Sequence, residues 1–311
     1  MKGHNSWAAL AVSLMALLLT AFLTAAALIL GGYSPLLAFQ SLLEGSFGSL
    51  DSFLGVTLVR AIPLIVTGLA VTVAFKSGVW NIGAEGQFYA GAIAGVWVGL
   101  NVGDYPSLLS GSLVFLSAAV AGALWALLPA LMRTRLGVSE VVTTILMNFV
   151  AIHLVSYIVR WPLQEARGVF PNTDLIDKSV RLPSIVSGTG LHFGFVVAVI
   201  LVIGLYFFFS NTSMGFQLRA MGGSPEATRV SGRSSIPGLL IVTFLLSGSL
   251  AGLAGGIEIA GRTFALYEGL SPGWGYTAIA VALLANLNFI AVLLTGIFFG
   301  ALEGGAGAMQ R

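Results

Sequence analysis

Five polar side chains interrupt long apolar stretches of this sequence and are its clearest candidates for chemistry. They are Asn81, Glu85, Gln87, Asn148 and Glu258. An ionised carboxylate inside a bilayer costs on the order of 3 kcal/mol on insertion scales, so each buried glutamate should face a cavity or a partner. We therefore expect these side chains to line a route for a polar solute. For Glu258 a second interpretation stays open, because it lies near the end of its apolar run and would serve as an interfacial charge.

Three of the five fall in one stretch, residues 76–87, with the sequence KSGVWNIGAEGQ. Its glycines permit a broken or unwound helix start, which a membrane accepts only where the backbone lines protein or water. We expect this stretch to form the wall or gate of a central pathway. The alternative is a helix cap in the inner headgroup region.

Other kinds of chemistry lack the residues that they require. The sequence has no cysteine, which excludes disulfides, thiolate catalysis and thiolate metal sites. His153 stands alone, without an H-x-x-x-H or H-E pattern, so no metal site is predicted. No lysine lies in a glycine-rich phosphate loop, so we expect no ATP hydrolysis by that route and no cofactor in this chain. Since no Ser, His and Asp set clusters in neighbouring apolar runs, we predict that the chain is not an enzyme.

Membrane helices must position these residues. Hydrophobic residues make up 57% of the 311-residue chain and charged residues only 8%, against roughly 25% charged residues in a soluble domain. At about 20 residues per crossing, the sequence predicts an all-α, polytopic helical bundle with about eight apolar segments, some of them broken or re-entrant. The segments lie at residues 7–30, 53–75, 79–100, 107–132, 140–159, 193–209, 236–260 and 276–302. The first is interpreted as an anchor, because it is longer than the roughly 7 to 15 apolar residues of a signal peptide.

A polar, mildly basic island at residues 210–235 separates two of these segments. Within it Ser224 is a good N-cap, Pro225 suits the first helical position, Glu226 sits in the first turn and Gly232 can end the helix. The island predicts a short helix between two spans. A helix on the cytoplasmic side is expected to touch a partner.

The basic residues predict the orientation. If each of the first seven segments crosses once, one side carries seven Lys and Arg residues and the other carries five. The first set is Lys2, Lys76, Arg133, Arg135, Arg219, Arg229 and Arg233, and the second is Arg160, Arg167, Lys178, Arg181 and Arg262. Loops 31–52 and 101–106 contain neither residue type, so we place the amino terminus and the 210–235 loop in the cytoplasm. The 160–192 loop then lies outside as an ordered cap, either a connector or a docking surface for an external partner.

Three further patterns bear on packing. Glycine recurs at every fourth position in residues 91–99, 248–256 and 296–304, which predicts close approach of helices. The tripeptide 286–288 divides the last apolar run into two pieces that look too short to cross, a feature of transporter pathways. Arg60 is expected to snorkel to the membrane surface and receives no role. The small net charge of +2, without a basic run, predicts no nucleic-acid partner.

Four longer motifs resemble a known family. They are FKSGVWNIGAEGQFYAGAIAG at 75–95, GVSEVVTTILMN at 137–148, GFQLRAMGGSPEATRVSG at 215–232 and GWGYTAIAVALLA at 273–285. Together they look like the permease subunit of bacterial ABC importers in the branched-chain amino acid and simple sugar permease group. The likeness is closest to nucleoside-type permeases that work with a basic-membrane-lipoprotein receptor, and it extends over residues 53–305.

The resemblance implies specific roles and partners. The segment with Arg219, Pro225, Glu226 and Ala227, ending at Gly232, would be the coupling helix that docks on a separate cytoplasmic ATP-binding cassette ATPase. An external substrate-binding lipoprotein would deliver the solute, and two permease subunits, alike or different, would enclose one pathway in the lipid of a bacterial plasma membrane. Family members usually continue into another apolar helix after residues 296–307. This sequence instead ends at Arg311, without such a helix, so we expect the glycines at 296–304 to lack a packing partner.

The sequence thus predicts that residues 1–311 form a single transmembrane permease domain for ATP-driven import of a nucleoside or simple-sugar-like small polar solute. The alternative is a secondary transporter or channel driven by an ion gradient. That alternative needs an ionisable relay within the spans, for which Glu85 and Glu258 are the candidates.

Overall fold

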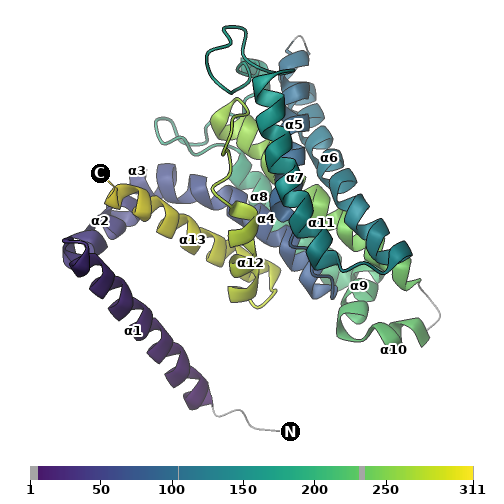
Figure 1. Ribbon diagram of the computed structural model, residues 1–311, viewed down its shortest axis with the longest axis horizontal. Helices are drawn as coiled ribbons and strands as arrows, with labels where there is room; N and C mark the ends of the chain where they lie inside the picture. The colour runs from purple at the N-terminus through teal and green to yellow at the C-terminus, as the bar shows by residue number, and fades with distance from the viewer. Residues whose placement is uncertain (1–5, 104, 231–234, 311) are drawn as a thin grey trace.

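The computed structural model describes residues 6–103, 105–230 and 235–310, which form helices and no strand (Figure 1). The α-helices are α1 Ser6–Leu30, α2 Pro35–Phe47, α3 Leu50–Ser52, α4 Val59–Lys76, α5 Ala84–Asn101, α6 Ser107–Leu136, α7 Glu140–Arg160, α8 Gly194–Asn211, α9 Ser213–Gly223, α10 Pro225–Val230, α11 Ile236–Glu258, α12 Trp274–Leu284 and α13 Phe289–Met309. Two π-helical turns, η1 Phe53–Leu58 and η3 Ile259–Thr263, and a 3-10 turn, η2 Lys178–Val180, complete the described elements.

Each of the eight predicted apolar segments coincides with helical structure. In the described part of the chain, six helices are long and apolar enough to cross a membrane, or seven if the bent pair α1 and α2 counts as one span. The prediction of a helical, polytopic membrane bundle is confirmed. Continuous spans form where π-helical turns join helices, as in Leu50–Lys76 and Ile236–Thr263.

Helix α4 forms the centre of the bundle. Nearly every residue from Val59 to Ala74 is buried, because the helix is apolar on all sides and packs against α8, α11, α12 and α13. A helix that is apolar all round is expected in such a buried position. The polar residues that follow α4 are therefore also carried into the interior.

Glycine ladders bring the backbones of α5, α6 and α11 into contact, as the spacing predicted. A Cβ atom at Gly91 would lie 2.1 Å from the Gly252 carbonyl oxygen, and one at Gly122 would lie 2.2 Å from that of Gly248. Helices held over small residues can approach closely without a hydrophobic driving force. These three helices therefore form one tightly packed unit.

The third ladder, on α13, does have a packing partner, so the expectation that it would be short of one is wrong. A Cβ atom at Gly296 would lie 2.4 Å from the Ile65 side chain, and one at Gly300 would lie 2.7 Å from the Thr57 carbonyl oxygen. Through this ladder α13 packs against α4 and η1 of the same chain.

Two connections differ from the prediction. Residues 31–52, expected to be a loop, contain α2, which begins at a Ser34 cap with Pro35 in its first turn and packs on α13. After the turn at 286–288, α13 has 21 residues and is long enough to cross, whereas α12, with 11 residues, is not. The Asn288 side chain accepts hydrogen bonds from the Ile290 and Ala291 amides and so caps the N-terminus of α13.

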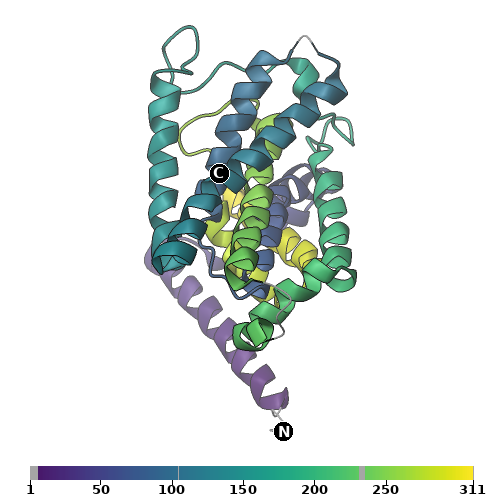
Figure 2. The same ribbon diagram turned by 90° about the vertical axis from the view of Figure 1, so that its right-hand side faces the viewer.

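The bundle has two distinct ends (Figures 1 and 2). The long 161–193 connection lies at one end, and α9, α10 and the start of α1 lie at the other. This arrangement agrees with the predicted separation of the 160–192 and 210–235 loops to opposite sides of a membrane.

Candidate functional site

The predicted break in the backbone lies between α4 and α5. Helix α4 ends at Lys76, α5 begins at Ala84, and Gly78 adopts a left-handed φ of 76° between them. The Asn81 side-chain oxygen accepts a hydrogen bond from the Gly83 amide at 3.0 Å, which holds the unwound segment in a turn. The glycines therefore provide a non-helical segment inside the protein, where such a backbone is tolerated.

Asn81 connects this segment to two helices. Its Nδ2 donates to Ser247 Oγ on α11 at 2.9 Å and to Gln87 Oε1 on α5 at 3.0 Å, and Gln87 Nε2 donates back at 3.0 Å. Ser247 in turn donates to the Ala70 carbonyl oxygen on α4 at 2.8 Å. Asn81, Gln87 and Ser247 are all buried, so their polar groups satisfy one another.

Asn148 closes the same cluster from α7. Its Oδ1 accepts from the Gly86 amide at 2.8 Å, and its Nδ2 donates to the Ile82 carbonyl oxygen at 2.9 Å and to the Tyr276 hydroxyl at 3.2 Å. Residues predicted separately at 81–87 and at 148 thus meet in one place. Tyr276, on α12, was not among the predicted residues.

Glu85 connects α5 to the start of α12. Its Oε2 accepts a hydrogen bond from the Gly275 amide at 2.6 Å, and the carboxylate is buried. A Cβ atom at Gly275 would lie 2.2 Å from the Glu85 backbone nitrogen, so the two helices meet backbone to backbone. A carboxylate at a helix N-terminus interacts favourably with the unpaired amides there.

The polar cluster of Asn81, Glu85, Gln87 and Asn148 lies near the middle of the bundle. Ser247, which bonds Asn81, follows Ile236, the first residue of α11, by 11 residues. At about 1.5 Å per residue this is roughly 16 Å along a helix, about half of a 30 Å hydrocarbon layer. Binding sites of membrane transporters are typically found at this depth, beside discontinuous helices.

Glu258 lies apart from that cluster, at the C-terminal end of α11. It is buried, with 1% of its side chain exposed, and its Oε1 lies 3.3 Å from Arg262 Nη1 on η3. Glu258 is therefore enclosed by the bundle and paired with Arg262, while its interpretation as an interfacial charge stays open.

A second ion pair nearby was missed by the sequence reasoning. Arg60 Nη1 lies 2.9 Å from Glu303 Oε1 on α13, and Glu303 Oε2 accepts from the Trp274 indole at 2.9 Å. Arg60, expected to snorkel outward, instead pairs with the carboxylate of Glu303. The available signal was that Glu303 is the sole charged residue within α13.

The polar island folds into two helices, α9 and α10. As predicted, Ser224 caps α10, its Oγ accepting from the Ala227 amide at 3.2 Å, and Pro225 begins the helix. Pro225, Glu226 and Ala227 are exposed, and Arg219 is half-buried on α9. Gly232, the predicted end of the helix, lies outside the described residues.

The end of α9 rests on the break between α4 and α5. A Cβ atom at Gly222 would lie 2.2 Å from the Lys76 carbonyl oxygen, and one at Gly78 would lie 3.0 Å from Gly222 Cα. Lys76 Nζ donates to the Leu287 carbonyl oxygen at 3.0 Å, which also connects this point to the turn before α13. The polar island therefore contacts the start of the unwound segment that leads into the polar cluster.

The 161–193 connection folds back on the segment that follows η3. The Thr173 amide donates to the Leu266 carbonyl oxygen at 2.9 Å and the Ile176 amide to that of Phe264 at 2.8 Å. At the base of the connection, burial followed by the nearby Arg262 charge lowers the pKa of His192 to about 4, so it is neutral near pH 7. The connection is therefore an ordered cap.

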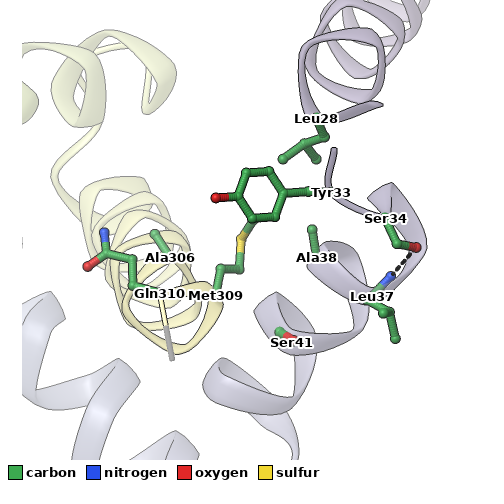
Figure 3. Close-up of a pocket in the computed structure, with 9 residues that line it drawn as sticks. All are labelled: Leu28, Tyr33, Ser34, Leu37, Ala38, Ser41, Ala306, Met309 and Gln310. Atoms are coloured by element: carbon green, nitrogen blue, oxygen red, sulfur yellow. Dashed lines mark hydrogen bonds between the residues drawn. The ribbon is translucent and has the colours of Figure 1, made fainter. Parts of the chain in front are cut away.

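A hollow of about 740 Å³ lies at the edge of the molecule, between the α1–α2 bend and the end of α13 (Figure 3). Its lining is mixed, with apolar side chains such as Leu28 and Met309 and polar ones such as Tyr33, Ser41 and Gln310. None of the residues predicted to contact a solute borders it. Among the described residues, no group of three or more His, Cys, Asp or Glu side chains is arranged to hold a metal ion.

Comparison with known proteins agrees with this architecture. Residues 53–311 match the family model described as the permease component of the branched-chain amino acid transport system. The chain is 40% identical to a glucose ABC transporter permease protein of Haloferax volcanii, over 84% of this chain and 72% of that protein. It is 35% identical to a guanosine ABC transporter permease protein of Bacillus subtilis, over 96% of this chain and 85% of that protein.

A third relative is the nucleoside ABC transporter permease protein of Lactococcus lactis, 31% identical over 99% of this chain and 86% of that protein. No solved structure shows a significant match. The match to the family model covers the broken segment, the polar cluster and the α9–α10 pair. The chain belongs to the family of permease components of the branched-chain amino acid transport system and is a membrane-embedded ABC transporter permease.

Proposed function

We propose that this permease imports a nucleoside or simple-sugar-like small polar solute, driven by a separate cytoplasmic ATP-binding cassette ATPase that docks on α9 and α10. The observation that carries the proposal is the contact of Gly222 with the backbone at Lys76 and Gly78. Through this contact the surface helix α9 touches the unwound segment 77–83, which lies beside the buried polar cluster.

Exposed groups on α10 suit a partner surface. Glu226 and Arg229 form an ion pair of 2.7 Å, and their side chains are 72% and 71% exposed, respectively. Val230 is 78% exposed. Ion pairs this exposed contribute little to the free energy of folding. Both side chains can therefore contact a partner without destabilising the fold. The proposed docking surface includes Arg219, Pro225, Glu226 and Ala227.

Movement of α9 would act on the pathway through the break. Helices α4 and α5 are packed rigid elements, whereas residues 77–83 join them without a helix. A push at Gly222 would shift this joint and change the bonds of Asn81 and Asn148. Such a shift between two packed arrangements is a common route of alternating access.

The proposed pathway borders the polar cluster and Glu258. Asn81, Glu85, Gln87 and Asn148 are bonded internally in this conformation. We infer a closed state, in which the solute would replace these internal partners when the bundle opens. The relatives named for glucose, guanosine and nucleosides support a neutral polar solute.

The proposal places the chain in a bacterial plasma membrane with its amino terminus inside. A second permease subunit would complete the pathway, and an external lipoprotein would deliver the solute to the face that carries the 161–193 connection. The distribution of Lys and Arg between the two ends supports this orientation.

Replacing Arg219 and Glu226 together by alanine tests the proposal. We expect ATP hydrolysis by the assembled complex to continue while ATP-driven uptake of labelled guanosine falls at least tenfold, because the docking surface no longer transmits movement. Uptake and hydrolysis are measured on the same proteoliposomes.

The matched control replaces Arg133 and Glu140, an ion pair of 3.1 Å between α6 and α7 at the same end, and should change neither quantity by more than twofold. Unchanged coupling in the Arg219 and Glu226 double variant would refute the proposed role of α9 and α10. Uptake by the purified chain without any ATPase would favour a carrier driven by an ion gradient.

A further inference from the structure

Four charged side chains gather toward the outer half of the bundle, away from the polar cluster. Arg60 pairs with Glu303 at 2.9 Å, and Glu258 pairs with Arg262 at 3.3 Å. Trp274, which donates to Glu303, packs on Phe88, and the Phe88 carbonyl oxygen lies against Gly255, three residues before Glu258. The two pairs, which we call the paired-charge group, therefore lie on either side of one packing contact and are drawn from α4, α11, η3 and α13.

This group remains partly open. Side-chain exposure is 27% for Arg60, 26% for Glu303 and 35% for Arg262, whereas the Glu258 side chain is buried, with 1% exposed. Charged groups within membrane segments face a protein interior or water rather than lipid, and they mark solute pathways. Arg60, Glu303 and Arg262 therefore keep part of their surface outside the packed interior.

The local backbone is unusual on both sides of the group. The π-helical turn η1 ends directly before Val59 and Arg60, and η3 begins directly after Glu258 and contains Arg262. Such turns are rare and often occur at functional sites. The Arg60 side chain lies along Gly304 and Gly307 of α13, since Cβ atoms there would lie 3.8 and 3.6 Å from its Cδ and Nη2.

Aromatic groups connect the paired-charge group to the polar cluster. Trp274 donates to Glu303 at 2.9 Å and packs on Phe88 with ring centroids 5.6 Å apart. The next residue, Gly275, holds Glu85. Trp274 and its neighbour Gly275 therefore connect Glu303 of the paired-charge group to Glu85 of the polar cluster.

The charges of the group determine the class of solute that suits it. Two guanidinium groups and two carboxylates sum to zero, and each arginine already has a carboxylate partner. Hydroxyl groups can accept from an arginine and donate to a carboxylate without breaking either pair. A bound anion would lie close to the carboxylate of the same pair, and repulsion between the two negative charges would oppose its binding.

We propose that the Arg60–Glu303 and Glu258–Arg262 pairs, with the Trp274 indole, form an outer subsite that receives a neutral polyhydroxylated solute before it reaches the polar cluster. This inference rests on the proposed function and extends it to named residues and a solute class. The subsite accepts guanosine or glucose and rejects a phosphorylated nucleoside.

The absence of cysteine allows a direct test of occupancy. A Cβ atom at Gly307 would lie 3.6 Å from Arg60 Nη2, an ordinary contact distance, so Gly307→Cys places a thiol beside Arg60. Tyr105→Cys is the control, because Tyr105 is 53% exposed in the connection between α5 and α6, outside the spans. Each variant is assembled with its ATPase and receptor, and its reaction with a charged methanethiosulfonate reagent is timed. We expect excess guanosine or glucose to slow labelling at 307 at least threefold, with no effect at 105 and no protection by guanosine 5′-monophosphate.

Failure of protection by both neutral solutes, or equal protection by the monophosphate, would overturn the subsite. A thiol at 307 that is unreactive with and without solute would also overturn it, because the surface would then be covered by another subunit. ATP-driven uptake of the same solutes by the original complex is measured in parallel. Uptake without protection refutes the subsite alone, whereas absence of uptake refutes the proposed function.

A charge exchange provides a second variant. Arg60→Glu with Glu303→Arg keeps an ion pair between α4 and α13 but reverses the groups offered to the solute and to Trp274. We expect the exchanged complex to assemble and hydrolyse ATP while uptake falls at least tenfold. Restoration of full uptake by the exchange would mean that the pair only holds the helices together, and would contradict the subsite.

Discussion

Single residues in the middle of the bundle act mainly through buried hydrogen bonds between helices. Asn81 shows this most clearly, because both ends of its amide are bonded while the residue is fully buried. Its partners Gln87 and Ser247 belong to different helices, so one side chain fixes α5 and α11 to the unwound segment. A buried polar group left without its partner costs about 1–3 kcal/mol.

Asn81→Ala is therefore expected to lower the free energy of unfolding by about 2 to 3 kcal/mol. Denaturant titration of the purified protein in mild detergent measures the change. Asn101→Ala is the matched control, because Asn101 is exposed at the end of α5 and bonds only its own helix, at the Trp97 carbonyl oxygen. The interpretation of Asn81 as a central connector is wrong if both variants lose the same stability.

At the scale of helices, the closeness of α5, α6 and α11 depends on the absence of side chains at their contacts. Gly252 illustrates this, since a Cβ atom there would lie 2.3 Å from the Ala118 carbonyl oxygen and 2.8 Å from Gly122 Cα. Both obstacles are backbone atoms, which cannot rotate away. The helices would have to separate to admit a larger residue.

Gly252→Leu is expected to prevent stable assembly of the bundle, seen as a loss of the monodisperse peak in detergent gel filtration. Gly204→Leu, in α8, should preserve the peak, because Gly204 meets no atom within 4 Å of its Cβ position. Both changes introduce the same side chain into an apolar helix. Survival of Gly252→Leu with an unchanged peak would show that the three helices are not held at backbone contact.

For the whole molecule, the length of the apolar runs predicted a helical membrane protein with eight apolar segments, because the thickness of the bilayer determines the length of a span. The glycine spacing predicted the tight packing, because small residues allow helix backbones to approach closely. The sequence also brought out the break before α5 and the Ser224 cap of α10, which depend on neighbouring residues. It could not reveal the partners of Arg60 or the contact of Gly222 with Lys76. Those contacts join residues distant in the chain, and no local pattern encodes them.

Helix α2 was missed for a related reason. Its residues lie in a stretch that is short for a span, and its stability comes from packing on α13, with Ser46 Oγ bonding the Ala301 carbonyl oxygen. The role of Glu303 was hidden in the same way, because a single glutamate in a glycine-rich helix gains its meaning only from Arg60 and Trp274.

The central claim is that this permease receives its driving force from a separate ATPase through α9 and α10. Purification of the tagged protein from native membranes in mild detergent, with identification of the copurifying chains, tests it most directly. The account predicts a stoichiometric ATP-binding cassette ATPase that is lost when the α10 residues 225–230 are scrambled and retained when the exposed residues 166–171 at the opposite end are scrambled. Purification of the intact chain without any ATPase, or an ATPase retained after α10 is scrambled, would contradict the account.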